Sequence, residues 1–345
     1  MFIAWKPKKL IILLIVVLAA AVIGGVFYLF RPTAMPYDGC EEPGQENEQQ
    51  IEEAPLPSEP QKTDFIKWVD FKVTYPVLEQ AYQYDVKSYG SDLHLHWIEL
   101  LAYVAAKEGN KFPDKKSSEM DKLVGRLKKG ETMESITANM KYYDFYKEAY
   151  TAILGEFLGE YIKNETVKYG LIAFSPVAKG YSFSHYKDFG VSRSYGFTRR
   201  HLGNDLMGSI GTPIVAAEGG FVDNLGWNQY GGWRVGIRSF DGKRYYYYAH
   251  LRKDHPYPKT LMEGQEVKAG DVIGYLGMTG YSVKENVNNI NTPHLHFGMQ
   301  LIFDESQREG IHEIWIDVYP MIELLNKNKV SVAKDAATKD YYRVD

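Results

Sequence analysis

Hydrophobic residues are most concentrated near the start of the chain. Residues 10–30, LIILLIVVLAAAVIGGVFYLF, form a run of 21 positions without a charged side chain. As a helix this run would be about 30 Å long, which is the thickness of the hydrocarbon core of a bilayer. A cleaved signal peptide has a shorter apolar core, about 7 to 15 residues, and no small-residue cleavage site follows closely here. The pattern therefore predicts an uncleaved transmembrane anchor.

The charges beside this run predict its orientation. Lys6, Lys8 and Lys9 precede it, whereas Arg31 is followed by an acidic stretch. Because lysine and arginine are retained on the cytoplasmic side of a membrane, residues 1–9 are predicted to be cytoplasmic. The rest of the chain would then be extracytoplasmic, as in a single-pass membrane protein.

The next segment, residues 31–62, is polar and carries eight acidic side chains. It has few large apolar residues, so it cannot bury enough surface to offset the entropy of its chain. We expect a disordered acidic stalk between the anchor and the folded part.

Residues 63–170 place apolar side chains at helical spacing. The segments 97–109 and 146–162 show this period clearly, and the segment 117–130 begins with serine and ends with glycine, as a capped helix does. We expect a small all-α domain here, and the pattern assigns it no role.

After residue 171, short β-prone runs alternate with turns that are rich in glycine. Asp241 and Gly242 lie between two of these runs and predict a β-hairpin. We expect a mainly antiparallel β domain over residues 171–325 and a charged, loosely held tail over residues 326–345. The predicted fold class is therefore α+β, with several domains. The clearest β-prone runs are 212–220, 233–239, 244–251, 271–277 and 294–301.

Length, cysteine content and charge narrow the class of protein. A chain of 345 residues exceeds the roughly 150 residues of one typical domain. The single cysteine, Cys40, can form no disulfide within the chain, so the folded part must be stabilised by its core. The formal net charge is −4 and no basic stripe stands out, so we expect no nucleic-acid partner.

The tripeptide His-Leu-His occurs twice. In a strand, residues i and i+2 point to the same face, so His294 and His296 would present two imidazoles side by side. In a helix, the same two positions lie about 200° apart around the axis. His94 and His96 lead into a helical run, so we expect their rings to diverge and to have a structural role.

A second motif supplies further metal ligands from the β domain. His201 and Asp205 are four residues apart around Gly203, and such positions share a face in an extended segment. A carboxylate with two histidines gives three ligands and leaves one position open, which is the composition of a catalytic zinc site. We expect one zinc ion per chain.

His250 extends this candidate site. It closes the run RYYYYAHL, in which alternation predicts that Tyr246, Tyr248 and His250 share one face. Its place at the end of a strand, near a loop, is typical of functional residues.

Four segments resemble a known family in their order and spacing. HLGNDLMGSIGTPIVA, YYYYAHL, VKAGDVIGYLGMTG and PHLHF, within residues 190–300, resemble the LytM/lysostaphin-type zinc metallopeptidases, which cut peptidoglycan peptides. The resemblance implies a peptidase domain of that type. It also implies that His201, Asp205 and His296 bind the zinc ion.

The same resemblance implies that His250 and His294 form the catalytic pair. One imidazole would act as general base and the other would stabilise the oxyanion, with their division of labour left open. Tyr195 is a further candidate for oxyanion stabilisation. Residues 281–292 form a longer connection than the family usually has at this place, so we expect them to shape the cleft.

These patterns predict a membrane-anchored zinc endopeptidase that hydrolyses peptide bonds of bacterial cell-wall peptidoglycan. The predicted location is the bacterial cell membrane, with the catalytic domain outside. One alternative is a protein that keeps the fold with weak or no activity and serves as a peptidoglycan-binding scaffold or activator in an envelope or secretion complex. Another is a structural spacer, in which the stalk and the helical domain hold an envelope protein partner.

Overall fold

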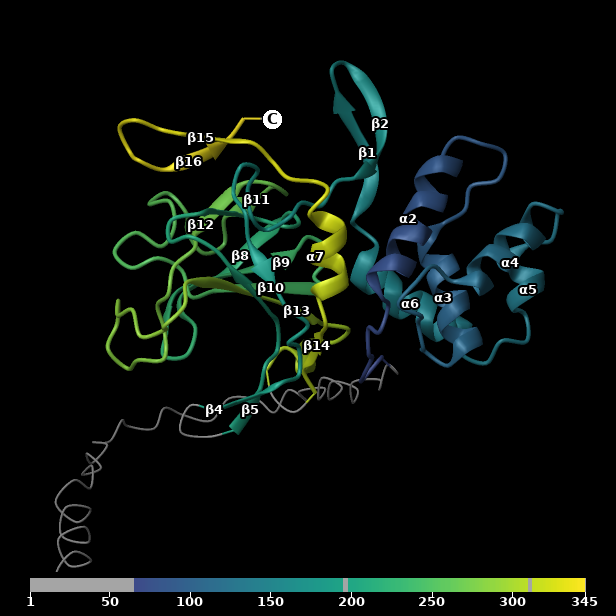
Figure 1. Ribbon diagram of the computed structural model, residues 1–345, viewed down its shortest axis with the longest axis horizontal. Coiled ribbons are helices and arrows are strands. Elements are labelled where there is room, and N and C mark those ends of the chain that lie inside the picture. Colours follow the sequence, from purple (N-terminus) through teal and green to yellow (C-terminus); the bar gives the residue numbers. More distant parts are fainter. Residues whose placement is uncertain (1–64, 195–197, 310–311, 345) are drawn as a thin grey trace, which may run out of the picture. The chain divides into compact units, whose positions relative to one another are not determined.

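A computed structural model describes residues 65–194, 198–309 and 312–344 (Figure 1). These residues belong to one compact unit, Thr63–Asp345. Most of its helices precede residue 155, and the remainder is mainly β. The helices are α2 (Tyr75–Ser88), α3 (Trp97–Glu108), α4 (Ser118–Leu127), α5 (Met133–Thr137), α6 (Tyr143–Leu154), α7 (Tyr319–Leu325) and the 3-10 helix η1 (Glu305–Gln307).

The strands are mostly short and follow the helices along the chain. They are β1 (Leu158–Lys163), β2 (Thr166–Leu171), β3 (Ser184–His185), β4 (Ser192–Ser194), β5 (Thr198–Arg200), β6 (Asn204–Met207), β7 (Pro213–Val215), β8 (Gly220–Asn228), β9 (Gly232–Ser239), β10 (Arg244–Ala249), β11 (Glu266–Val267), β12 (Val272–Tyr275), β13 (His294–Leu301), β14 (Ile314–Ile316), β15 (Val332–Lys334) and β16 (Tyr341–Arg343).

An eight-stranded antiparallel sheet forms the centre of the β region. Its order is β11-β8-β9-β10-β13-β6-β3, with β14 paired to β13. β13 lies between β10 and β6, and its register sets His296 opposite Ala249 on one side and opposite Asp205 on the other. The mainly antiparallel β domain predicted from the sequence is confirmed. The predicted hairpin is confirmed too, because β9 and β10 pair across the turn that contains Gly242, whose φ is +73°.

Alternation along β13 separates a core face from a polar face. Leu295, Phe297 and Met299 are almost fully buried, while His294 and His296 point to the opposite side and line a pocket. A strand with this pattern stabilises the sheet through one face and displays chemistry on the other.

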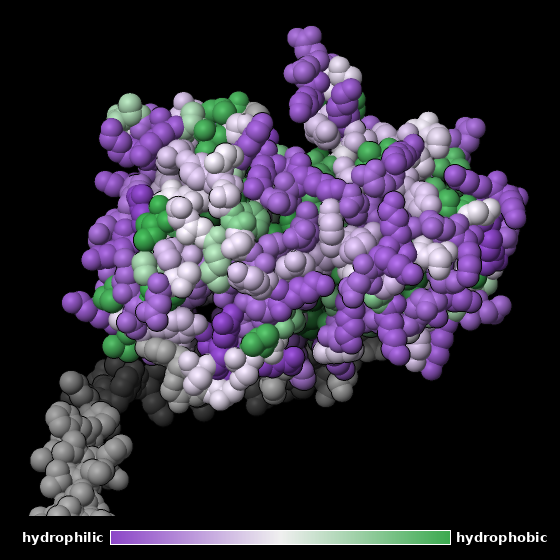
Figure 2. Space-filling view, in the orientation of Figure 1, coloured by the Kyte–Doolittle hydropathy of each residue, from purple (hydrophilic) through white to green (hydrophobic). Residues whose placement is uncertain are grey.

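The helices bury their apolar stripes in the same core as the sheet. In α4, Met120, Leu123, Val124 and Leu127 follow helical spacing and are buried, while the outer side of this region is mainly hydrophilic (Figure 2). The core cluster includes residues of α3 and of β13. The domain boundary near residue 170 stays a prediction.

A buried arginine also connects the sheet to the helices. The Arg244 side chain in β10 is fully buried, and its Nε donates to Glu218 Oε2 at 2.8 Å. Its Nη1 donates to the carbonyl oxygen of Ala152 in α6 at 2.5 Å. The pairing matters because a buried guanidinium without partners would be strongly destabilising.

The helix predicted over residues 146–162 is too long. α6 ends at Leu154, and β1 and β2 form a hairpin after it. Asn164 and Glu165 connect the two strands with φ of 51° and 60°, which is the conformation that a two-residue type I′ turn requires. Glutamate is unusual in this turn, so the segment carried no strong hairpin signal.

The end of the chain is more ordered than a loose tail. β15 and β16 form a hairpin, and Val330 before it is fully buried. Asp340 Oδ1 accepts hydrogen bonds from His255 Nε2 at 2.6 Å and from the Tyr275 hydroxyl at 2.9 Å. The described part of residues 326–345 therefore packs against the β region.

The predicted location in a membrane is corrected by the structure. Within residues 65–194, 198–309 and 312–344, no helix is long and apolar enough to cross a bilayer. The longest of these helices, α2, has 14 residues, or about 21 Å against the roughly 30 Å of a hydrocarbon core. Residues 10–30 and 31–62, predicted as anchor and stalk, lie outside the described residues.

Candidate metal centre

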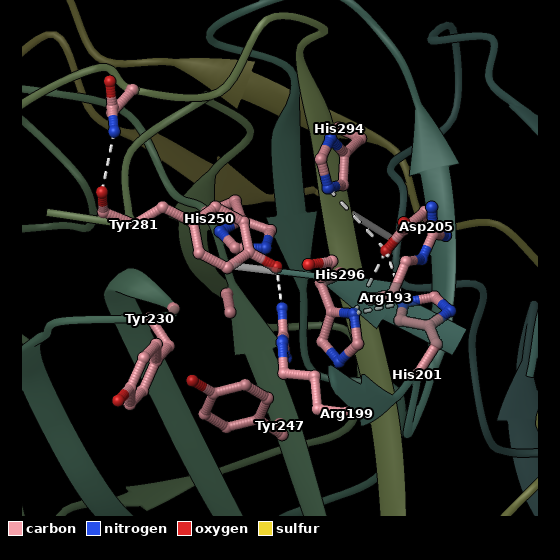
Figure 3. A pocket seen from close by; sticks show the side chains of 14 residues that line it. Arg193, Arg199, His201, Asp205, Tyr230, Tyr247, His250, Tyr281, His294 and His296 are labelled. Atoms are coloured by element: carbon pink, nitrogen blue, oxygen red, sulfur yellow. Dashed lines mark hydrogen bonds and ion pairs between the residues drawn. The ribbon is translucent and has the colours of Figure 1, made fainter. Parts of the chain in front are cut away.

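A pocket of about 320 Å³ opens on the polar face of β10 and β13 (Figure 3). The five residues singled out from the sequence all line it, although they span almost a hundred positions of the chain. They are His201, Asp205, His250, His294 and His296.

Paired strands and the chain segments at their ends bring these five side chains together. Asp205 lies in β6 and His296 lies directly opposite it in β13, so two of the expected ligands are cross-strand neighbours. His201 comes just before β6 and is buried, with 3% of its surface exposed. His250 follows the last residue of β10 and has a left-handed backbone, with φ of 62°.

Three of the side chains converge on one point. His201 Nε2 lies 3.0 Å from Asp205 Oδ1 and 2.9 Å from His296 Nδ1. His296 Nδ1 lies 3.0 Å from the same carboxylate oxygen. In a tetrahedral zinc site with bonds of roughly 2.0 to 2.2 Å, neighbouring donor atoms are about 3.3 Å apart. Two imidazole nitrogens and one carboxylate oxygen at these separations fit Zn²⁺.

A second carboxylate holds His201 in the orientation that a ligand needs. His201 Nδ1 lies 3.1 Å from the Asp188 carbonyl oxygen and 3.2 Å from Asp188 Oδ2. Arg193 Nη2 donates to the same carboxylate at 2.8 Å and to Asp205 Oδ2 at 3.2 Å. These contacts direct His201 Nε2 toward Asp205 and His296. Because Arg193 binds Oδ2 of Asp205, the other oxygen, Oδ1, faces the two histidines. Neither Asp188 nor Arg193 belongs to a sequence motif, so neither was predicted as part of the site.

Contacts between the histidines and carboxylates shift the pKa values of His201 and Asp205 in opposite directions. Burial disfavours a charged imidazole, but hydrogen bonds to Asp188 and Asp205 outweigh it and raise the pKa of His201 to about 9. Burial alone would raise the pKa of Asp205, yet hydrogen bonds from His201 and His296 hold it well below its usual range. A metal ion that binds here must therefore displace a proton from His201.

The other two histidines are held by carbonyl groups behind them. His294 Nδ1 donates to the carbonyl oxygen of Thr292 at 2.8 Å, and its Nε2 lies 3.7 Å from Asp205 Oδ1. His250 Nδ1 donates to the carbonyl oxygen of Thr279 at 2.9 Å. The two ring centroids are 4.8 Å apart. In this tautomer each neutral ring offers an unprotonated Nε2 that can accept a proton.

Burial keeps one of these rings neutral. It lowers the pKa of His250 well below its usual value, and the neighbouring His294 and His296 lower it further. His250 is therefore an uncharged hydrogen-bond acceptor at neutral pH.

The predicted face of β10 is wrong in one respect. Tyr246 and Tyr248 are fully buried on the core side, and Tyr247 lines the pocket instead. His250 reaches the pocket because it lies beyond the strand and its positive φ turns the chain. The alternation rule applies within a strand, so it fails at this position. Tyr195, the other oxyanion candidate, lies outside the described residues.

The rest of the pocket wall is aromatic and cationic. Tyr281 and Asn289 come from the long connection 281–292, as expected for a segment that shapes the cleft, and Asn289 Nδ2 donates to the Tyr281 carbonyl oxygen at 2.7 Å. Tyr230 and Arg199 complete this side. Neither residue belongs to a sequence motif, so neither was predicted: Arg199 lies in the short strand β5 and Tyr230 in the turn between β8 and β9.

Comparison with known proteins finds a family model that matches the part of the chain carrying this pocket. The model of peptidase family M23 matches residues 199–308. The L-Ala--D-Glu endopeptidase of Bacillus subtilis (strain 168) is 34% identical over 159 residues, which cover 46% of this chain and 47% of that protein. Lysostaphin of Staphylococcus simulans is 36% identical over 120 residues, which cover 34% of this chain and 20% of lysostaphin. The chain thus spans about half the length of the first relative and a fifth of the second.

A solved structure resembles a larger part of the chain. It comes from Ruminococcus gnavus ATCC 29149 and is named as a candidate glycyl-glycine endopeptidase lytM. The alignment has a TM-score of 0.52 and 26% sequence identity, and it covers 76% of this chain and 92% of that one.

Proposed function

We propose, on the premise that residues 199–308 are a domain of peptidase family M23, that this chain is a zinc-dependent endopeptidase of bacterial peptidoglycan. One observation carries the proposal. Three donor atoms of the zinc-ligand type lie within 3.0 Å of one another in a pocket that also contains His250 and His294, whose Nδ1 atoms donate to backbone carbonyl groups. Peptide-bond hydrolysis needs both a Lewis acid and a proton acceptor, and this pocket supplies residues for each.

His201, Asp205 and His296 are the residues that would hold the zinc ion. When bound, zinc supplies Lewis acidity for the scissile carbonyl group and the attacking water. Asp188 keeps the Nδ1 proton of His201 in place, so the imidazole remains a neutral ligand through Nε2.

His294 is our candidate for the general base. Its Nε2 faces the ligand cluster at 3.7 Å from Asp205 Oδ1, so it is close to any water held there. It would accept a proton from that water at Nε2 and return it to the leaving amine. The Thr292 carbonyl stabilises the imidazolium that forms in between, because it already accepts the Nδ1 proton.

His250 has a different task in this scheme. Its ring is neutral and fixed by Thr279, so its Nε2 can accept a hydrogen bond and orient the attacking water toward the substrate. As a neutral acceptor it cannot donate to an oxyanion unless it is first protonated, which its lowered pKa disfavours.

The substrate class is inferred from the relatives and from the cleft. The named relatives include an L-Ala--D-Glu endopeptidase, lysostaphin and a peptidoglycan DD-endopeptidase of Vibrio cholerae. Tyr230, Tyr247 and Tyr281 give the cleft broad aromatic surfaces, and Arg199 gives it positive charge. These features suit a short peptide that carries a carboxylate, as peptidoglycan stem peptides do.

Two measurements on the purified full-length chain test the proposal. Mass spectrometry of peptidoglycan after incubation should detect new amino and carboxyl ends at one type of peptide bond. Metal analysis should find zinc that is lost from His201→Ala and His296→Ala but retained by His294→Ala and His250→Ala, all four being inactive or nearly so. Intact peptidoglycan after incubation with zinc-loaded protein would favour the scaffold or activator alternative.

A further inference from the structure

We propose that Asp85, His94 and His96 form a second binding site for a divalent transition-metal ion of the zinc type. We call His201, Asp205 and His296 the first cluster. The inference does not rest on the proposed peptidase activity, because neither Asp85 nor the two histidines line the pocket of that cluster. It concerns the copy of His-Leu-His that the sequence pattern assigned to a helix.

The two histidines lie just outside the helix. α3 begins at Trp97, and His96 before it has an extended backbone, with φ of −66° and ψ of 118°. Leu95 between the two histidines is buried, with 4% exposed. In such a segment, the residues on either side of Leu95 turn to the opposite face together. The rings of His94 and His96 accordingly lie 4.1 Å apart between centroids, so the expectation that they diverge is wrong.

Hydrogen bonds fix this segment against the end of α2. The backbone amide of Leu95 donates to Ser88 Oγ at 2.8 Å, and that of Trp97 donates to Asp85 Oδ2 at 2.8 Å. The positions of both histidines are therefore set by the fold. The His96 side chain makes no capping hydrogen bond to α3, which leaves its nitrogens available for a ligand.

A buried carboxylate faces the two rings. Asp85 is 1% exposed, and its Oδ1 lies 2.7 Å from His94 Nε2 and accepts from the Tyr169 hydroxyl at 3.0 Å. Among the described residues, His94 is the one side chain recorded in an ion pair with this carboxylate. A buried negative charge is costly without a cation nearby. A metal ion bound beside Asp85 would supply that cation.

The donor set decides which ion would bind. One ligand atom from each of the three residues lies within 4.8 Å of the other two. Two imidazole nitrogens with one carboxylate oxygen suit Zn²⁺, Co²⁺, Ni²⁺ or Cu²⁺, whereas Ca²⁺ and Mg²⁺ prefer oxygen ligands throughout. His96 is exposed, so an ion can enter from solvent and keep water in its remaining positions.

The surroundings indicate a structural role for this ion. Tyr169 in β2 donates to Asp85, and its ring stacks on Tyr89 at 3.8 Å between centroids. A metal held by Asp85, His94 and His96 would link α2 to the segment before α3, and Asp85 also accepts the hydrogen bond from Tyr169 of the β1–β2 hairpin. Within the described residues around it we find no further histidine that could act as a base, unlike in the first cluster.

Zinc binding to defined variants of the full chain tests the proposal. Equilibrium dialysis followed by metal analysis should give two zinc ions per wild-type chain and one in Asp205→Ala, which lacks a ligand of the first cluster. In the double variant Asp205→Ala/His96→Ala the count should fall to none. His96 is exposed, so its replacement leaves the core intact, and Asp205→Ala/His312→Ala, which removes an exposed histidine outside both clusters, is the matched control that should keep one ion.

The outcomes separate this proposal from the peptidase proposal. If Asp205→Ala is folded by circular dichroism and binds no zinc with a Kd below about 10 µM, the second site is refuted while the first stands. If wild type holds one zinc that His96→Ala loses and Asp205→Ala keeps, the first site fails and the second stands. His96→Ala alone should retain peptidase activity within about twofold, and zinc should raise the Tm of Asp205→Ala but not that of the double variant.

Discussion

The two His-Leu-His segments of this chain have the same sequence but lie in different structural surroundings. Residues 294–296 lie in β13, between β6 and β10, where cross-strand register brings a carboxylate opposite His296. Residues 94–96 lie in a short extended segment between α2 and α3, where Asp85 reaches them from α2. Both copies present their rings on one side of the backbone, so the tripeptide's local conformation does not distinguish them.

What distinguishes them is the set of groups around the rings. Around β13, Asp188 contacts His201, Arg193 contacts Asp188 and Asp205, and His250 adds a neutral ring beside His294. Before α3, the neighbours are a buried carboxylate and two stacked tyrosines. A metal site becomes catalytic through an open position and a proton acceptor next to it. By our two proposals, one tripeptide of this chain serves catalysis and the other serves stability.

The largest expected effect comes from removing a ligand in β13. His296→Ala should lose the zinc ion held with His201 and Asp205 and lower kcat/KM on peptidoglycan peptides by about 10⁴-fold or more, because the remaining two ligands cannot hold that ion in place. The matched change before α3, His96→Ala, should leave kcat/KM within about twofold. Equal losses in both variants would break the distinction between the two copies.

Within β13, the two histidines should separate metal binding from turnover. His294→Ala should keep zinc but lower kcat by about 10³-fold, since general-base catalysis contributes roughly 10² to 10⁴. Metal analysis beside steady-state kinetics measures both quantities, and His312→Ala serves as control. Loss of zinc from His294→Ala would mean that both rings of this copy are ligands.

The pH dependence of zinc affinity sharpens the comparison further. The pKa of His201 is raised to about 9 in the metal-free protein by hydrogen bonds that outweigh burial, so this imidazole is protonated at neutral pH and must lose its proton to bind zinc. Affinity at the first cluster should rise by about tenfold per pH unit, or about 100-fold from pH 6 to pH 8.

Competition titrations with a chelator on the His96→Ala variant would measure this slope for the first cluster alone. Removal of a supporting carboxylate in Asp188→Asn should lower the pH at which the slope flattens, and Asp114→Asn, an exposed carboxylate, should not. A pH-independent affinity would show that His201 is not protonated in the free protein.

The smallest expected effect is on stability. His94→Ala leaves Asp85 buried without its ion-pair partner, so the free energy of unfolding of zinc-free protein should fall by about 2 kcal/mol. His96→Ala, which removes an exposed ring, should change it by less than about 0.5 kcal/mol. Urea unfolding followed by circular dichroism measures both, and an equal change in the two variants would contradict the contact pattern.

The candidate site could be predicted to a large extent because its motifs are local. The alternation around His296 depends on strand geometry, and the four-residue spacing of His201 and Asp205 is a motif within one short segment. The fold of the β region followed from the same short-range patterns. Alternation failed at His250, where a positive φ outside the strand sets the direction of the ring. The β1–β2 hairpin was missed because Asn164 and Glu165 are not a typical turn pair.

By itself, the sequence determined the kinds of ligand, the strands that carry them and the family that the segments resemble. Tertiary structure alone decided that Asp188 and Arg193 orient the first cluster, and that Asp85 closes the second one beneath His94 and His96. The physical reason is that backbone periodicity arises from neighbours in the chain. Contacts such as that between His201 and Asp188 instead depend on how loops return to the sheet, which no local pattern encodes.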